Sequence, residues 1–571
     1  MQVHDTDLIF GAEGQVVLME GKSCFKMVGP QEGPTRIYLY GEIFGGGKHD
    51  LQIGSKFENL FGRFVAVVVD ERGGKVCIIP DRYGLMPFYF WQENGRIVFG
   101  AHLEDFIRRG LSHTIDPAAL SDISANLVPF CDRTLVSGVK SVTGRRAFEI
   151  RLDHYSLTTM VNWEPTGCIE QSTIPLTDVQ HQLGELFMEG VEKATFGHAA
   201  VALTLSGGVD SRVLLAACAE LGKDTEAYTI GVPESRSLVY AKRMADLCGA
   251  EHTAIRLGDS FQQSYIEINR ANVRQTCAMS FSHEAESRYL RDRVSQGRVV
   301  LHGAFAELYK IDSLHEFAIG RGSFGLDSAE VPKFVWSKIV GRYTRTMRLF
   351  SEEVRSGLRV RAKDDLEADL RSYSPGIGTV GKMQCLYIDE FLRKVVTSSM
   401  QIWNAKLPTR LPFSYPPFVD LLLQVRPEDR LGNRFPAAFL AATCPSLLKV
   451  PNANTGVLIQ SGKAMAMANR VFSAIKLHLF RNKSHYDHSD MVAWLKNTDP
   501  PLMELVDSLS ANPMFDHSEL ARISETLLRL RPISTRYGSG LAQSIHFAIM
   551  LDDWIRENQV NLGSTRWVEK L

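Results

Sequence analysis

The sequence predicts an α/β protein with a β-rich N-terminal domain and a larger second domain, built on a parallel sheet and ending in helices. Up to about residue 160, short β-branched and aromatic runs alternate with glycine turns, which is typical of hairpins. After about residue 178, single strands alternate with helices, which favours βαβ units. Beyond about residue 330 the apolar spacing is mostly helical. We therefore expect a first domain over 1–162, a linker over 163–178 and a second domain over 179–571.

The first domain is expected to hold few helices. Its strands include RIYLYGEIF, RFVAVVVD, KVCIIP and RIVFG, and the turn from Glu71 to Gly74 has the glycine that a tight hairpin needs for a positive φ. Helical spacing is confined mainly to AHLEDFIRRGL and DPAALSDISANL. In the second of these, Asp116 can cap the helix and Pro117 fits its first position.

The linker WEPTGCIEQSTIPLTD mixes Pro, Gly, Thr and Ser without apolar periodicity, as segments between domains do. After it, Thr177 and Asp178 open an amphipathic helix. The strand HAAVALTLS, the helix SRVLLAACAELG and the strand TEAYTIGV then complete a βαβ unit. This order predicts a parallel sheet, because the crossover helix returns the chain to run in the same direction.

Composition excludes several classes of protein. Lys and Arg number 64 against 65 Asp and Glu, and this balance argues against a nucleic-acid binder that works by bulk charge. The nine cysteines show no C-x-x-C and no zinc-ligand spacing, which favours reduced thiols. No apolar run approaches the roughly 18 residues needed to cross a bilayer, and the N-terminus carries no signal pattern. We expect a cytoplasmic protein with no membrane or nucleic-acid partner.

A glycine turn between a strand and a helix is the clearest candidate site. Ser206-Gly207-Gly208-Val209-Asp210-Ser211 places two glycines and two hydroxyls before the first turn of a helix, where unpaired N–H groups attract anions. The alternative is a purely structural turn in which a serine caps the helix. Asp210 is unfavourable beside phosphate unless a cation lies between them, so the loop implies Mg²⁺.

This loop resembles the S-G-G-x-D-S signature of pyrophosphatase-loop ATP enzymes, and the resemblance extends along the chain to the asparagine-synthetase-like family. It implies a class II glutamine-amidotransferase-like first domain of the αββα type, followed by a pyrophosphatase-loop ATP domain with a helical C-terminal part. The matching fragments are Tyr40-Gly41-Glu42-Ile43-Phe44, Gly62-Arg63-Phe64-Val65-Ala66, Asp81-Arg82-Tyr83-Gly84-Leu85-Met86-Pro87-Phe88-Tyr89, Tyr228-Thr229-Ile230-Gly231, Arg410-Leu411-Pro412-Phe413 and Asn454-Thr455-Gly456.

The resemblance also assigns site residues. It implies an ATP site in which the backbone of three residues contacts adenine, the loop holds the phosphates and two carboxylates hold Mg²⁺. The adenine residues are Leu203, Leu205 and Gly231, the phosphate residues are Ser206, Gly207, Gly208 and Ser211, and the Mg²⁺ ligands are Asp210 and Glu307. Gly303 is a further residue of the expected ATP site.

Three departures from the family pattern bear on the chemistry. Glutamine-dependent members expose an N-terminal Cys, whereas this sequence begins Met1-Gln2 and its first cysteine is Cys24, so we expect a first domain without glutaminase activity. Ala304 stands where β-lactam synthetases have Tyr and asparagine synthetases have Glu.

The nearest titratable residue to Ala304 is His302, with a reference pKa near 6.5, which is either a proton acceptor or a structural histidine. The third departure is the lysine of relatives near the C-terminal glycine, whose position is Asn454 here. Lys449 is our first choice for the missing cation, and a solvated lysine at a helix end is its alternative.

These residues predict ATP-dependent activation of a carboxylate as acyl-AMP, release of pyrophosphate and attack by an amine. The preferred substrate is a lasso-type peptide closed to a macrolactam, with a leader-peptide protease as a partner. The alternatives are an amide synthetase for a small molecule, a polysaccharide or a β-amino acid, and, from another class, a catalytically dead scaffold.

Two further motifs carry weaker signals. The adjacent carboxylates Asp389 and Glu390 predict a solvated helix face, because neighbouring residues point to different sides of a helix. His485, Asp487 and His488 resemble a metal cluster by composition, but a polar loop is the preferred interpretation.

Overall fold

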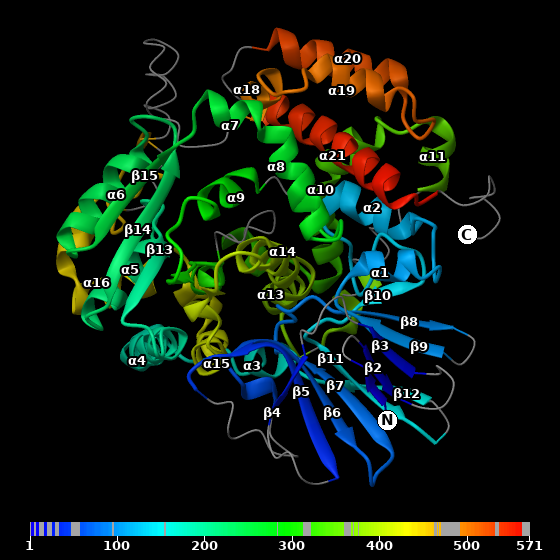
Figure 1. Ribbon diagram of the computed structural model, residues 1–571. Coiled ribbons are helices and arrows are strands. Elements are labelled where there is room, and N and C mark those ends of the chain that lie inside the picture. The colour runs from blue at the N-terminus through cyan, green and yellow to red at the C-terminus, as the bar shows by residue number, and fades with distance from the viewer. Residues whose placement is uncertain are drawn as a thin grey trace.

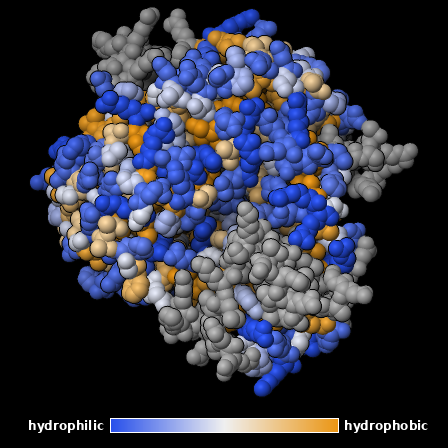
Figure 2. Space-filling view, viewed as in Figure 1, coloured by the Kyte–Doolittle hydropathy of each residue, from blue (hydrophilic) through white to orange (hydrophobic). Residues whose placement is uncertain are grey.

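The computed structural model shows the β-rich part and the α/β part packed side by side, with a cap of helices over both (Figure 1). It describes residues 34–46, 57–93, 96–153, 156–281, 284–311, 321–358, 370–374, 376–461, 491–530 and 536–561, four short strands before residue 34, and residues 367–368, 465 and 468–469. The motif around His485 and His488 lies outside these residues. Hydrophilic side chains cover most of the described surface in view, with apolar ones scattered among them (Figure 2).

Two six-stranded sheets form the N-terminal part, as the hairpin pattern predicts. One has the order β1-β2-β3-β9-β8-β10 and the other the order β12-β11-β7-β6-β5-β4. Every pair in the second sheet is antiparallel. The strands are β1 (Gln2–His4), β2 (Asp7–Phe10), β3 (Val16–Met19), β4 (Phe25–Val28), β5 (Thr35–Ile43), β6 (Gly62–Asp70), β7 (Lys75–Pro80), β8 (Tyr89–Glu93), β9 (Arg96–Gly100), β10 (Val139–Ser141), β11 (Arg146–Arg151) and β12 (Ser156–Val161).

Aromatic and β-branched side chains from both sheets meet in one buried core. Phe90 and Phe99 stack with ring centroids 5.6 Å apart, and Phe148 of the other sheet lies 4.9 Å from Phe90. Two helices lie between β9 and β10: α1 (Leu103–Arg108) and α2 (Pro117–Asn126). The cap of α2 is confirmed, since the Asp116 carboxylate accepts from two N–H groups of the first turn and proline stands at the helix start.

The second sheet system is parallel throughout, with the order β15-β14-β13-β16-β17. Its central strand β13 is buried on both faces, which explains its unbroken apolar run. The strands are β13 (Ala200–Thr204), β14 (Asp224–Gly231), β15 (Glu251–Arg256), β16 (Val299–Leu301) and β17 (Thr409–Arg410). Helices α5 (Asp210–Glu220), α6 (Arg236–Leu247) and α9 (Ala285–Arg291) pack against these strands.

The segment expected as a linker is packed against the protein rather than extended. It contains α3 (Thr166–Ile169), and Trp163, Ile169 and Leu176 are buried in the same core as the parallel sheet. The next helix, α4 (Leu176–Ala194), begins one residue before the expected Thr177. The boundaries 1–162 and 179–571 themselves stay predictions.

The rest of the chain is mostly helical, as expected. Helices from the C-terminal region share a second core with α1 and α2, so this layer bridges the two parts of the molecule (Figure 1). The helices of this core are α7 (Asp259–Gln263), α8 (Tyr265–Gln275), α10 (Val331–Met347), α11 (Glu352–Gly357), α18 (Met491–Lys496), α19 (Leu502–Leu509), α20 (His517–Arg529) and α21 (Arg536–Asn558). The core of the parallel sheet instead takes α13 (Thr379–Tyr387), α14 (Arg393–Asn404), α15 (Pro416–Gln424) and α16 (Arg434–Thr443). In the described part of the chain, none of the helices is both long and apolar enough to span a bilayer.

The prediction of a solvated face at Asp389 and Glu390 is wrong. Both side chains are buried in a π-helical turn, η8 (Ile388–Leu392), between α13 and α14. Asp389 pairs with Arg393 and lies 3.3 Å from a guanidinium nitrogen of Arg145 in the N-terminal part. Glu390 accepts from Lys394 at 2.6 Å and from the Cys131 N–H at 2.7 Å. The two carboxylates do point to different sides, but the N-terminal part covers both sides.

Candidate functional site

The glycine turn lies at the carboxyl end of β13, where parallel sheets generally bind their ligands. Gly207 has a φ of +67°, and a Cβ there would lie 3.1 Å from the Cβ of Ala453. A Cβ on Gly208 would lie 3.1 Å from the Ser206 hydroxyl. The positive φ explains the glycine at position 207, whereas a side chain at 208 would have to displace the Ser206 hydroxyl by a few tenths of an ångström. The helix α5 starts directly afterwards at Asp210.

The two serines of the loop hold each other in place. The Ser206 N–H donates to the Ser211 hydroxyl at 3.1 Å, and the two hydroxyl oxygens lie 3.2 Å apart. Ser211 is buried, whereas Ser206 is exposed. The Gly207 N–H has no hydrogen-bond acceptor among the described residues. An exposed hydroxyl, a free N–H and a helix N-terminus together make a site suited to phosphate oxygens.

Two carboxylates stand beside this loop. Asp210 opens α5, and Glu307 lies in the short helix η3 (Ala306–Tyr309), which follows β16. Burial, and then the charge of Asp210, raise the pKa of Glu307 to about 7. Its Oε2 atom is buried and has no hydrogen-bond partner.

A divalent cation would fit this pair of carboxylates, because it would give the buried Glu307 oxygen a partner and screen Asp210 from phosphate. Among the described residues no cluster of three or more His, Cys, Asp or Glu side chains stands ready to hold a metal ion. In nucleotide sites Mg²⁺ is commonly coordinated by one or two carboxylates, and phosphate oxygens and water supply its other ligands. The fit therefore agrees with the expected Mg²⁺ ligands, Asp210 and Glu307.

Asp210 itself is held by two neighbours that sequence reasoning missed. Tyr309 donates its hydroxyl to the Asp210 carboxylate, and the Lys310 ammonium lies 2.5 and 2.7 Å from its two oxygens. Gly303 lies against the same residue, since a Cβ there would come within 3.4 Å of the Asp210 Cβ. The strand order brings these residues together across about a hundred positions of sequence, because β16 pairs directly with β13.

The expected adenine wall is well ordered, but most of its backbone groups are already bonded. Leu203 pairs with β14 on one side and with β16 on the other. The Leu205 N–H donates to Tyr228, and its carbonyl accepts from the Thr229 hydroxyl at 2.6 Å. Gly231 closes β14, and a Cβ there would lie 2.7 Å from the Ser235 hydroxyl. The backbone of Leu203 is therefore used in strand pairing, whereas the Leu205 carbonyl keeps a second lone pair that can accept from a ligand.

His302 lies at the end of β16, close to the loop, but the expectation of a pKa near 6.5 is wrong. Burial lowers the pKa of His302 to about 4. Its Nδ1 accepts from the Ala304 N–H at 3.2 Å, so in the neutral ring the proton sits on Nε2. The ring packs near Trp403, with centroids 6.1 Å apart. His302 is therefore neutral at pH 7 and does not titrate near neutrality.

Lys449 ends the short helix η11 (Pro445–Lys449), and its side chain is exposed. The segment around it does reach the loop. The buried Arg212 donates to the carbonyls of Val450 at 2.6 Å, Pro451 at 2.8 Å and Gly207 at 3.4 Å. Arg212 directly follows the S-G-G-x-D-S signature, but nothing in its position along the sequence shows that it turns inward to fasten the C-terminal segment.

The C-terminal glycine motif has its own cation. Gly456 has a φ of +69°, and a Cβ there would lie 2.7 Å from a guanidinium nitrogen of Arg236. Arg236 begins α6, and its neighbour Ser237 lies against Gly207. Sequence reasoning looked for this cation downstream, near Asn454, and therefore missed an arginine that comes before it in the chain.

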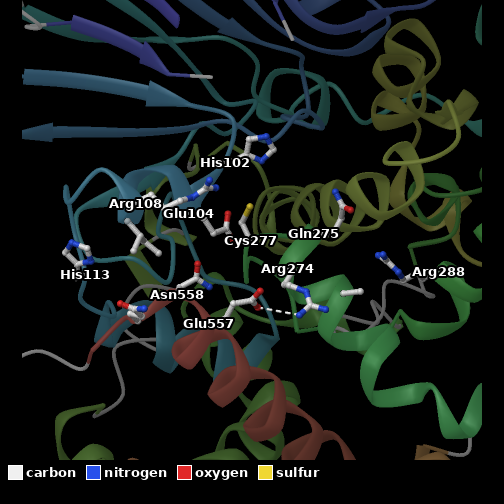
Figure 3. Close-up of a pocket in the computed structure, with 13 residues that line it drawn as sticks. His102, Glu104, Arg108, His113, Arg274, Gln275, Cys277, Arg288, Glu557 and Asn558 are labelled. Carbon is white, nitrogen blue, oxygen red and sulfur yellow. Dashed lines mark ion pairs between the residues drawn. The ribbon is translucent and has the colours of Figure 1, made fainter. Parts of the chain in front are cut away.

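A separate cavity of about 1010 Å³ lies between α1 and the C-terminal ends of α8 and α21 (Figure 3). Arg274 and Glu557 face each other across it, 3.6 Å apart. Burial raises the pKa of Cys277 well above its usual value and also raises that of Glu104, so the thiol is not a nucleophile near neutral pH. None of the residues predicted for the ATP site lines this cavity.

Comparison with known proteins agrees with the two-part architecture. Residues 182–436 match the family described as asparagine synthase, and residues 51–160 match the glutamine amidotransferase domain. The chain is 26% identical over 167 residues to asparagine synthetase [glutamine-hydrolyzing] 3 of Bacillus subtilis (strain 168). That match covers 28% of this chain and 26% of the relative, so it spans about a quarter of the relative's length. With a glutamine-amidotransferase-like part followed by an asparagine-synthase part around an S-G-G-x-D-S loop, the chain is an asparagine-synthetase-like protein.

Proposed function

We propose that this protein is an ATP-dependent carbon–nitrogen ligase that activates a carboxylate as acyl-AMP, releases pyrophosphate and joins the acyl group to an amine. The observation that carries the proposal is the loop itself. It combines an exposed hydroxyl and a free N–H with the start of α5 at Asp210, and Asp210 is close enough to Glu307 for its charge to raise the pKa of that carboxyl. The match to asparagine synthase over residues 182–436 supports the same chemistry.

The chain's residues would divide the work as follows. Ser206, Ser211 and the loop N–H groups bind and orient the phosphates, so that the α-phosphorus faces the carboxylate. Asp210 and Glu307 would hold Mg²⁺, which supplies positive charge to the phosphate oxygens. The substrate carboxylate attacks the α-phosphorus and pyrophosphate leaves. The amine then attacks the acyl carbon, and AMP leaves with the electrons of the broken C–O bond.

The attacking amine must lose a proton, and His302 is a poor acceptor for it. Its low pKa makes it a weak base, and its Nδ1 lone pair already accepts from Ala304. His302 in a catalytic role therefore stays a prediction, as does Lys449, whose exposed side chain makes no printed contact with the loop.

For the substrate we propose a peptide whose carboxylate and amine close to a macrolactam of the lasso type, after a leader-peptide protease has acted. The support is a residue type: Ala304 stands where the resemblance places Tyr or Glu, and a smaller side chain at that position is compatible with a bulkier acyl group. The alternative substrates are a small molecule, a polysaccharide and a β-amino acid. Comparing the rates of amide formation when the candidate substrates compete in one reaction distinguishes among them.

Exchange of radiolabelled pyrophosphate into ATP tests the reaction class. We expect exchange that depends on both Mg²⁺ and a carboxylate, with AMP as the nucleotide product in the presence of an amine. Asp210→Asn is the loop variant for this assay, and Asp246→Asn on the exposed face of α6 is a matched control. Production of ADP instead of AMP would contradict the proposal, and absence of ATP binding would favour the scaffold.

A further inference from the structure

Lys310 is the cation nearest to the signature aspartate, although none of the family fragments marks it. Its ammonium lies 2.5 and 2.7 Å from the two oxygens of Asp210. Its side chain is 14% exposed, against 29% for Asp210, so the pair sits at the wall of the site and not on open surface. Lys310 directly follows η3, the helix that carries Glu307.

The ammonium of Lys310 has a hydrogen-bond donor to spare. A lysine carries three N–H donors, and the two oxygens of Asp210 account for two of them. Within the part of the chain that the structure describes, no other acceptor lies within hydrogen-bond distance of this nitrogen. The remaining donor can therefore serve a ligand without breaking the ion pair.

The pair is also fixed before any ligand arrives. Tyr309 donates to Asp210 as well, and Gly303 packs against the Asp210 Cβ. Because Lys310 is already held by this pair, it loses little further conformational entropy when an anion binds, and less of its interaction energy with the anion is offset. The ion pair also removes the net charge of Asp210, which would otherwise repel phosphate.

We propose that Lys310 is a phosphate-binding residue of this site, whose ammonium stays paired with Asp210 and donates to the pyrophosphate end of ATP. The proposal rests on the proposed function, because it requires that ATP bind at the S-G-G-x-D-S loop. It leaves Lys449, the candidate for the cation that relatives carry near the C-terminal glycine, as a separate prediction. It also predicts a component of phosphate binding that survives the removal of divalent cations.

Isothermal titration calorimetry of the full chain tests this, with inorganic pyrophosphate as the probe, once with EDTA and once with Mg²⁺. We expect Lys310→Met to weaken pyrophosphate binding in EDTA by about tenfold or more, as loss of a charged hydrogen bond does. Lys310→Arg retains binding within a few-fold. Lys242→Met removes another lysine that pairs with an aspartate, on the exposed face of α6, and leaves binding unchanged.

Adenosine, which carries no phosphate, is the second probe, and all four proteins should bind it equally. If Lys310→Met lowers the melting temperature too far for titration, Lys310→Gln, which keeps a polar side chain without the charge, takes its place with the same expected loss. Equal pyrophosphate binding by wild type and the uncharged variant overturns the role of Lys310 and leaves the ATP site standing. Failure of the wild type to bind ATP or pyrophosphate even with Mg²⁺ overturns the proposed function and this inference with it.

Discussion

Two aspartates of this molecule, Asp81 and Asp210, belong to family-like fragments, and they make opposite kinds of contact. Asp81, in the N-terminal part, is buried and accepts from the N–H groups of Phe64, Tyr83, Leu85 and Met86 at 3.0 to 3.2 Å. Asp210 is partly exposed, and among the residues that the structure describes its carboxylate accepts from two side chains, Lys310 and Tyr309. The first carboxylate fixes the backbone of its own loop, whereas the second pairs with side chains of a segment about a hundred residues away. A matching motif therefore identifies a relative, and the partners of each residue identify its role.

The largest effect should come from Asp210→Ala, which tests whether Asp210 acts on a ligand and not on the fold. We expect AMP formation to fall by at least about a hundredfold, because the site loses one metal ligand and the partner that positions Lys310. The melting temperature should change by only a few degrees, since little buried apolar surface is lost. Turnover assays and thermal melts measure the two effects. Wild-type AMP formation by a normally folded variant would show that the nucleotide site is elsewhere.

Asp81→Ala should do the reverse and destabilise the fold. Four buried N–H groups lose their acceptor, so we expect the free energy of unfolding to fall by roughly 3 kcal/mol or more. Urea denaturation measures this loss, and pyrophosphate binding by the folded fraction should stay at the wild-type level. A variant as stable as the wild type but unable to bind nucleotide would reverse the roles given to the two aspartates.

The pH dependence of stability sharpens the same contrast. Burial raises the pKa of Asp81 from 3.8 to about 6, although its four N–H donors act in the opposite direction. Between these pH values the folded chain holds a proton that the unfolded chain has released, so stability falls as pH rises through this window. The difference corresponds to roughly 3 kcal/mol at most. Asp81→Asn cannot titrate at this position, so denaturation of both proteins from pH 4 to 7 should show a steeper fall in the wild type, while the slope that remains in the variant comes from other raised carboxyls such as Glu307.

The smallest effect should come from Lys449→Met. An exposed ammonium is screened by water and salt, so we expect pyrophosphate binding and amide formation to change by less than about threefold. Single-turnover rates at two salt concentrations measure this. A loss of a hundredfold would instead return to Lys449 the role that the sequence pattern suggested.

The sequence was sufficient for the features that local patterns encode. Hairpin spacing, βαβ alternation, the Asp116 cap and the S-G-G-x-D-S turn each depend on residues within a few positions of one another. Lys310, Arg212 and Arg236 could not be found in this way, because their roles depend on contacts made across strand pairing and across long stretches of chain. The low pKa of His302 and the burial of Asp389 and Glu390 were missed for a related reason. The burial of a side chain depends on segments that are distant in sequence and pack against it.

The residue just before η3 ties the phosphate site to the N-terminal part. Phe305 has a φ of +73° and is almost fully buried, with its ring 4.6 Å from that of Tyr83, in the loop that Asp81 organises. Arg82 and Asp420 add an ion pair at 2.6 Å across the same boundary. A chain cut at residue 179 would leave Phe305 facing water on one side while still holding a backbone conformation that few bulky residues adopt. The segment that bears Glu307 and Lys310 would then lose part of its packing, so the N-terminal part helps to hold these two side chains in place whether or not it performs chemistry of its own.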